Sequence, residues 1–316
     1  MTQTNLALKK LQGIKPKGVK PRLENTDLEK LIDLGNYFID SRSCDFSSRA
    51  VGVGAKYRRK FNKEFDNLIT KYTLNNDLLT NVIHASYQDL SGKEALIFGL
   101  YSGFLLTELT KRKHKNKKLS VFYFNGMGNR FDNLFYLAKR VDVLILDNLV
   151  GNDAGISLGC EGGKLGVVAG ANLTGENIFS DLNFHYAGCK AFFAYNINTE
   201  LSTNNIVLAN RSYKDYFQKG DFVFMPRRKN HWDSRFYNKL SDLNKSDNEL
   251  DILSSDELIN QFNPTSTQKK TWNEMRAGKM FDLLRILSKD SESLESNLKQ
   301  IALMSQGYWV KRNYEY

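Results

Sequence analysis

Residues 143–175, VLILDNLVGNDAGISLGCEGGKLGVVAGANLTG, contain two copies of one pattern. In each copy an apolar tetrad is followed, after one intervening residue, by an asparagine and then, three residues later, by a glycine. Similar tetrads at 121–124 and 191–194 also lead to an asparagine, and the steps between successive asparagines are 23, 24 and 24 residues. The four asparagines are Asn125, Asn148, Asn172 and Asn196, and the apolar residues ten positions after them are Phe135, Leu158, Leu182 and Ile206. A constant step of this kind indicates a structural repeat.

A strand, a turn and a second apolar anchor at a constant step are typical of a β-solenoid, in which each repeat stacks on the one before it. Equivalent strands would then lie about 4.8 Å apart. The four asparagines would stack in register, with their amides hydrogen-bonded along the axis of the stack. We therefore expect a right-handed β-solenoid core that is flanked by helical elements at both ends of the chain.

Part of the repeat is similar to a known family. The residues that carry the likeness are Asp153, Ala154, Gly155, the run LGCEGGKL at 158–165, Val168 and Gly170. They resemble the Gly-rich right-handed β-helix repeat of the carboxy-terminal domain of glutamate synthase and of the C subunit of formylmethanofuran dehydrogenase. The resemblance covers residues 95–213, is closest at 147–170, and fails at 130–135, where RFDNLF replaces the Gly-rich half. It implies a structural domain beside catalytic partners and brings no catalytic residues.

An α/β sheet is the alternative fold. It would take strands from residues 95–98, 121–124 and 143–146, with crossover helices at 104–112 and 130–140. Leucine-rich repeats share the period, but they place an apolar residue two positions after the asparagine. Here the apolar residue follows directly, as in Leu149.

The segments on either side of the repeat predict four parts of the chain. Residues 1–23 are expected to form a flexible basic arm, 24–94 a helical unit, 95–213 the solenoid, and 214–316 a loop followed by a helical cap. Thr26 and Glu29 form a capping-box pattern, which predicts that a helix begins there. In the last part, the spacing of Met280, Leu283, Leu284 and Leu287 predicts a helix with one apolar face.

Charge gives the first indication of function. Residues 1–120 contain 22 Lys and Arg against 12 Asp and Glu, whereas the rest of the chain is balanced. A basic segment on a neutral body favours a polyanionic partner. We therefore expect a non-catalytic binding or scaffold protein that docks on RNA or a ribonucleoprotein, with a protein partner as a second candidate. The expected nucleic-acid-binding residues are Lys9, Lys10, Lys15, Lys17, Lys111, Arg112, Lys113, Lys115, Lys117 and Lys118, and the run at 111–118 is expected to be a loop.

Two weaker basic and metal-like patterns are present as well. Arg227, Arg228 and Lys229 precede Trp232 and Arg235, a mixture of cations and an aromatic ring that is typical of contacts with unpaired bases. His185 and Cys189 are four residues apart, and Cys160 lies about one repeat earlier, but a zinc site needs four ligands. No metal or cofactor is therefore expected.

The opposing interpretation is an enzyme, or an enzyme subunit, that acts on a sugar or a small metabolite through the solenoid face. Asp147, Asp153 and Asp181 would be its carboxylates, although none belongs to a paired-carboxylate motif, and no catalytic residue is assigned. The sequence has no apolar stretch of membrane-spanning length and no pattern typical of a secretory signal, and its three cysteines do not indicate a disulfide framework. The expected location is the cytoplasm.

Overall fold

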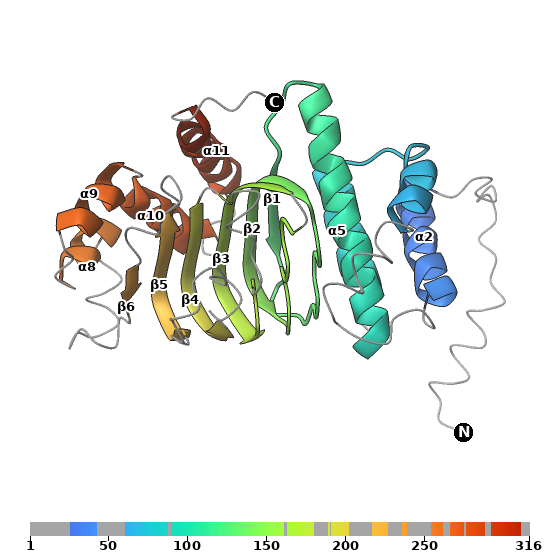
Figure 1. The fold of residues 1–316 in the computed structure, drawn as a ribbon, viewed down its shortest axis with the longest axis horizontal. Helices are drawn as coiled ribbons and strands as arrows, with labels where there is room; N and C mark the ends of the chain where they lie inside the picture. The colour runs from blue at the N-terminus through green and yellow to red at the C-terminus, as the bar shows by residue number, and fades with distance from the viewer. Residues whose placement is uncertain are drawn as a thin grey trace.

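The computed structural model describes residues 26–42, 61–87, 90–160, 163–179, 189, 191–201, 217–226, 236–238, 254–261, 266–274, 276–287 and 292–310. In this part of the chain, helices come first, strands follow, and further helices end the fold (Figure 1). The helices are α2 (Asp27–Arg42), a helix at residues 61–69, α4 (Asn76–Ser86), α5 (Gly92–Lys115), α8 (Ser255–Gln261), α9 (Ser266–Glu274), α10 (Ala277–Leu287) and α11 (Leu294–Val310).

The strands form one six-stranded sheet whose spatial order is the order of the chain. They are β1 (Val121–Asn125), β2 (Arg140–Val150), β3 (Lys164–Glu176), β4 (Ala191–Leu201), β5 (Phe217–Pro226) and β6 (Phe236–Asn238). Strands β1 to β4 pair in parallel, and β5 and β6 continue the sheet with antiparallel pairing.

The predicted β-solenoid is wrong. Each repeat contributes one strand to a single open sheet, and helices pack on both faces of that sheet, so the architecture of the described residues is α/β-like (Figure 1). The repeat step did not distinguish the two folds, because it fixes only the offset between neighbouring strands. The apolar tetrads carry the missing information: a strand that is apolar on both faces requires cover on both faces.

The α/β alternative is correct in part. The helix expected at 104–112 lies inside α5, but residues 95–98, expected as a strand, belong to the same helix. Residues 130–140 do not form the second expected helix. Asn133, Phe135 and Leu137 have φ angles of 61°, 58° and 55°, which no right-handed helix can contain. Every second residue of this stretch thus turns the chain, which packs beside the sheet as a series of turns.

The register of the parallel strands follows the repeat. Val121 pairs with Val143, Val143 with Val167, and Val167 with Ala191. The asparagine stack is present over two steps, because Asn196 Nδ2 donates to Asn172 Oδ1 at 2.7 Å and Asn172 Nδ2 donates to Asp147 Oδ1 at 2.9 Å.

Asn125 departs from the expected stack. It pairs in register with Asp147 and not with Asn148, the expected partner, which is the next residue of the chain. The stack therefore ends on an aspartate, which replaces the expected asparagine as the acceptor of the Asn172 amide.

Alternate residues of the strands point into two separate cores. Phe122, Leu144 and Phe192 pack with α2, the 61–69 helix, α4 and α5, whereas Ile145, Ala169 and Phe193 pack with α9, α10 and α11. The expected anchors Phe135 and Leu158 are fully buried, which confirms that prediction; Leu182 and Ile206 lie outside the described residues.

Helix α5 packs closely against the segment between β1 and β2. A Cβ atom added at Gly99 would overlap the Asn133 carbonyl group, and one added at Gly103 would overlap the Tyr136 carbonyl oxygen. Only a glycine lets the helix backbone approach this near. The contact fixes where the carboxyl half of α5 stands relative to the amino end of β2.

Two predictions at the ends of the chain are confirmed. The backbone N–H of Thr26 donates to Glu29 Oε2 at 2.6 Å, so the capping box forms at the start of α2. The apolar face of α10 is buried. The predicted arm at 1–23 lies outside the described residues, and the predicted boundary at 94/95 falls inside α5. Among the described helices, none has both the length and the apolar character needed to cross a membrane.

Candidate anion-binding site

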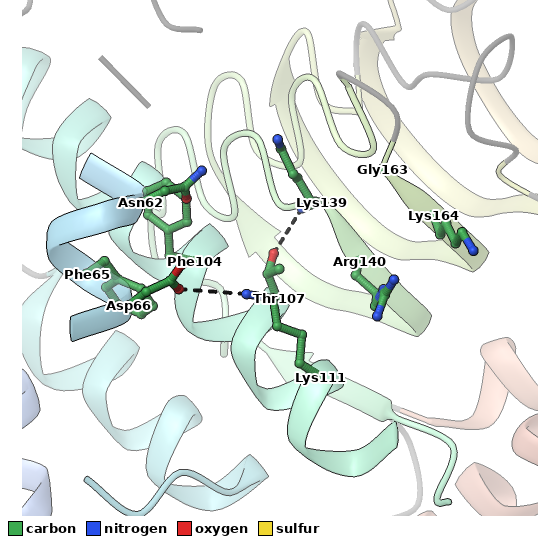
Figure 2. Close-up of a pocket in the computed structure, with 10 residues that line it drawn as sticks. All are labelled: Asn62, Phe65, Asp66, Phe104, Thr107, Lys111, Lys139, Arg140, Gly163 and Lys164. Carbon is green, nitrogen blue, oxygen red and sulfur yellow. Dashed lines mark hydrogen bonds and ion pairs between the residues drawn. The ribbon is translucent and has the colours of Figure 1, made fainter. Parts of the chain in front are cut away.

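A cavity of about 280 Å³ lies between the 61–69 helix, α5 and the amino ends of β2 and β3 (Figure 2). We call it the basic cavity. The residues that line it are Asn62, Phe65, Asp66, Phe104, Thr107, Lys111, Lys139, Arg140, Gly163 and Lys164. Four of these are cationic, and Asp66 is the one carboxylate among them. The excess of positive charge in a concave site favours an anionic ligand.

The repeat brings two of the cations together. Arg140 begins β2 and Lys164 begins β3, and the two are direct partners in the parallel register. Lys118 stands 22 residues before Arg140, which is the offset between β1 and β2. Neighbouring strands are about 4.8 Å apart, so equivalent positions in the repeat form a row of positive charges along the amino edge of the sheet.

Helix α5 supplies the opposite side and fixes the segment before β2. Thr107 Oγ1 accepts a hydrogen bond from the backbone N–H of Lys139 at 2.9 Å and donates to the Gly103 carbonyl at 2.8 Å. One helical turn later, the Lys111 ammonium lies 3.7 Å from an Asp66 carboxylate oxygen and 3.5 Å from one of Glu108. Lys111 therefore faces the cavity with its charge partly balanced.

A buried carboxylate ties the end of α5 to the start of β2. Asp142 is 1% exposed, and its Oδ2 accepts from the backbone N–H of Ser120 at 2.7 Å and contacts His114 Nε2 at 2.7 Å. The basic end of α5 and the basic start of β2 are therefore neighbours. This is not a catalytic triad, because the Ser120 hydroxyl accepts from Thr110 and only the Ser120 backbone reaches the carboxylate.

The cations of the sheet side have different surroundings. Among the described residues, neither Arg140 nor Lys164 has a hydrogen-bond or ion-pair partner for its side chain. Figure 2 shows the side chains of Lys139, Arg140 and Lys164 fanning out from the rim of the cavity in different directions. Arg140 and Lys164 are thus long cations on an open rim, and their side chains are able to reach an anion at the cavity.

Of the predicted binding residues that the structure describes, Lys111 lines this cavity and the other five are not among its lining residues. Lys111, Arg112, Lys113 and Lys115 occupy the last turns of α5, so the run at 111–118 is helical as far as Lys115, and the expected loop is wrong for that part. Lys117 and Lys118 follow the helix and are exposed. The residues outside the described chain are Lys9, Lys10, Lys15 and Lys17, together with the 227–235 patch.

Arg112 has a different role from its neighbours. Its guanidinium donates to the carbonyls of Tyr72 and Ile69 at 2.7 and 2.9 Å and to Glu108 at 2.9 Å. These bonds hold the end of the 61–69 helix against α5. The side chain is consequently engaged in structure, unlike the lysines around it.

Sequence reasoning missed Lys139, Arg140 and Lys164. Each stands immediately before an apolar tetrad or near one, and their distance along the chain from residues 111–118 concealed the cluster. The available signal was the repeat itself, because Arg140 and Lys164 are separated by the same 24 residues as Asn148 and Asn172. Aligning the repeats would have shown the basic position.

A second polar cluster lies further along the strands. Asp147 is fully buried, and its Oδ2 accepts from the Tyr123 hydroxyl at 2.8 Å while Oδ1 accepts from Asn172. Burial raises the pKa of the Asp147 carboxyl, although the hydrogen bonds from Asn172 and Tyr123 oppose that shift. A carboxylate that no solvent reaches cannot contact a substrate, so we assign this cluster to the packing of the strands.

The weaker candidates of the sequence find no site here. Asp153 is 2% exposed, and the Cys189 thiol donates to backbone carbonyls of Gly166 and Ala191. His185 and Asp181 lie outside the described residues. Within the described ranges, no three His, Cys, Asp or Glu side chains are placed to hold a metal ion.

The chain was compared with protein-family models, with curated proteins and with solved structures, and no match was found in any of the three. The proposal for the function therefore rests on the geometry of the basic cavity and on the charges around it.

Proposed function

We propose that the protein binds single-stranded RNA through a basic surface at the amino edge of its parallel strands. We call this surface the basic rim and define it by Lys111, Lys113, Lys115, Lys117, Lys118, Lys139, Arg140 and Lys164. The observation that carries the proposal is the meeting of three basic segments, distant in the chain, around one cavity. Like charges held close together repel one another, and a bound polyanion removes that repulsion.

The charge balance of the rim supports a polyanion over a protein partner. Lys113, Lys115, Lys117 and Lys118 have no ion pair among the described residues. Each unpaired cation that contacts a phosphate releases condensed counterions, and this release is the main source of affinity in nucleic-acid binding. The affinity of a row of such cations for a polyanion therefore increases with the number of phosphates that the row contacts.

The shape of the site supports a single strand over a duplex. A concavity of about 280 Å³ is too small for a double helix to enter, whereas an unpaired nucleotide can turn its base or phosphate into it. Phe65 and Phe104, which are 1% and 5% exposed, belong to the core behind one wall of the cavity and present only their edges there. Recognition of RNA is commonly directed at such unpaired nucleotides.

The cavity gives no support to the enzyme interpretation. Asp66 is the one carboxylate in its described lining, and its side chain is 56% exposed. Glycoside hydrolysis requires two carboxylates on either side of the scissile bond. The arrangement suits binding of an anion without chemical change.

The test is a fluorescence-anisotropy titration of a labelled single-stranded RNA at about 0.1 M salt. A triple variant, Lys139→Gln, Arg140→Gln and Lys164→Gln, should bind about 5-fold more weakly if the three cations share one phosphate and about 100-fold more weakly if each contacts its own, because each lost phosphate contact removes about 0.7 log units relative to 1 M salt.

The matched control removes three charges elsewhere: Lys93→Gln at the start of α5, with Lys269→Gln and Lys270→Gln on α9. All three lysines are exposed, and α9 lies at the far end of the sheet from α5 (Figure 1). The control should keep most of the wild-type affinity. Equal weakening by both variants, or no RNA binding by the wild type, would show that the basic rim is not an RNA site. A DNA strand that binds as well as RNA would refute the choice of RNA.

A further inference from the structure

The basic cavity has two chemically different sides. Figure 2 shows Lys139, Arg140 and Lys164 on the side of the sheet, and Asn62, Phe65 and Asp66 on the side of the 61–69 helix, with Thr107 and Lys111 of α5 between them. An anion is therefore attracted to the sheet side and repelled by Asp66 on the helix side. A ligand with a charged end and a neutral end has one preferred orientation in such a cavity.

We propose that the basic cavity holds one nucleoside monophosphate unit, with its phosphomonoester against Arg140, Lys139 and Lys164 and its nucleoside toward Phe65 and Asn62. This inference rests on the proposed RNA-binding function and adds which part of the ligand enters the cavity. The same chemical group occurs at the phosphorylated end of an RNA strand and in a free mononucleotide.

Charge favours a terminal phosphate over an internal one. A phosphomonoester carries a charge of about −1.5 to −2 at pH 7, whereas each phosphodiester within a strand carries a single negative charge. Four cations and one carboxylate line the cavity, so a phosphomonoester balances the charge better than a diester does. An internal diester would also require the strand to enter and leave the same cavity.

Size agrees with a single nucleotide. Ligand sites for larger molecules usually have about 300–1,000 Å³. The cavity falls just below that range, which favours a ligand of about one nucleotide over a longer one.

The polar groups of the walls are arranged to hold a ligand in place. The hydroxyl of Thr107 is committed to Lys139 and Gly103, so it fixes the backbone that carries the cations. The contact between Lys111 and Asp66 keeps both side chains at the cavity, and it leaves Lys111 close enough to contribute to the field around the phosphate. Arg140 and Lys164, whose side chains fan outward in Figure 2, turn toward the cavity to contact the ligand.

The experiment compares ligands that differ by one phosphate. Short RNA strands of one sequence, with a 5′-phosphate, with a 3′-phosphate or with neither, are titrated against the full chain, and adenosine monophosphate, adenosine and inorganic phosphate are used as competitors. We expect a phosphorylated end to tighten binding about tenfold, which corresponds to a contact worth about 1.4 kcal/mol. Adenosine monophosphate should compete better than inorganic phosphate, and adenosine should not compete.

The variants are Arg140→Gln and Lys164→Gln, with Lys93→Gln as the control. The two cavity variants should lose the preference for a phosphorylated end, and the control should keep it. Thermal unfolding of each variant verifies that it is folded, and the heat of binding of adenosine monophosphate gives a second readout that does not depend on RNA.

The outcomes separate the two proposals. RNA binding that is salt-dependent but indifferent to the terminal phosphate would overturn this inference and leave the proposed function intact. Inorganic phosphate that competes as well as the mononucleotide would overturn the nucleoside part. Absence of any RNA binding would refute the proposed function itself. A phosphate preference that only the cavity variants abolish supports the inference, and competition by the free mononucleotide shows that a strand is not required.

Discussion

The packing of α5 determines where the basic cavity forms, and replacing either of its close-contact glycines by alanine tests that packing. A Cβ at Gly103 would overlap the Tyr136 carbonyl oxygen and lie 3.2 Å from the backbone nitrogen of Ala138. A Cβ at Gly99 would overlap the Asn133 carbonyl group. In both cases the obstacle is backbone, so the helix itself must move away from the segment before β2.

The expected cost follows from two opposed effects. Alanine in place of glycine stabilises a helix interior by about 1 kcal/mol, whereas overpacking of a close contact costs about 1–3 kcal/mol. One backbone overlap and two tight backbone approaches at Gly103 place it in the upper part of that range, so Gly103→Ala should lose about 1–2 kcal/mol of unfolding free energy. The shift of α5 should also weaken the hydrogen bond between Thr107 and Lys139.

Urea unfolding followed by circular dichroism measures the change, with Lys93→Ala on the exposed start of α5 as the control. That control should stay within about 0.5 kcal/mol of the wild type. If helix propensity alone decided the outcome, the variants with alanine at position 99 or 103 would be as stable as the wild type or more stable. Such a result would refute the close approach of α5 to the segment before β2.

Three further predictions concern residues outside the rim. Leu158→Ala should cost about 2–5 kcal/mol in urea unfolding, because it empties a fully buried site, and a variant with unchanged stability would contradict that burial. Burial raises the pKa of the Asp147 carboxyl above 3.8, so the folded protein keeps this proton to a higher pH than the unfolded chain does. The stability of the wild type should therefore fall, relative to that of Asp147→Asn, as the pH rises from below 3.8 through the raised pKa. A difference in stability that is independent of pH would contradict this. Arg112→Gln should cost about 1–3 kcal/mol through the loss of its hydrogen bonds to the Tyr72 and Ile69 carbonyls, yet weaken RNA binding less than Arg140→Gln does.

The strands were predictable from the sequence, but the way they are covered was not. The apolar tetrads located β1 to β4, and the 24-residue steps predicted the register of β2, β3 and β4, whereas β1 pairs with β2 at an offset of 22 residues and not 23. The same steps suit a solenoid and an open parallel sheet equally, so the repeat alone could not exclude the wrong fold. The two apolar faces of β2, with Leu144 on one side and Ile145 on the other, required helices on both sides.

The segment at 130–140 shows the limit of periodicity. Phe131, Leu134 and Phe135 have helical spacing and are all buried, but the chain between them turns repeatedly through positive φ angles. Backbone hydrogen bonds to the next connection, such as Gly155 N–H to the Leu134 carbonyl at 2.7 Å, replace the bonds that a helix would have made. Tertiary pairing overrides local propensity there.

The sequence predicted the type of ligand for the candidate site, but it predicted only some of the residues that form the site. The charge excess of residues 1–120 indicated a polyanion, and Lys111 from the basic run lines the cavity. The side of the cavity formed by the sheet depends on strand register, which brings Arg140 beside Lys164. A count of charges along the chain does not predict that pairing, whereas an alignment of the repeats does.

The salt dependence of RNA binding tests the account most directly, because its slope counts phosphate contacts. The logarithm of the association constant should fall linearly with the logarithm of the salt concentration, by about 0.7 per contacted phosphate on a single strand. Removing Lys139, Arg140 and Lys164 together should flatten the slope by about 0.7 if they share one phosphate and by about 2 if each contacts its own, and removing Lys93, Lys269 and Lys270 should leave it unchanged. Equal slopes for the wild type and the rim variant would contradict the assignment of RNA binding to the basic rim.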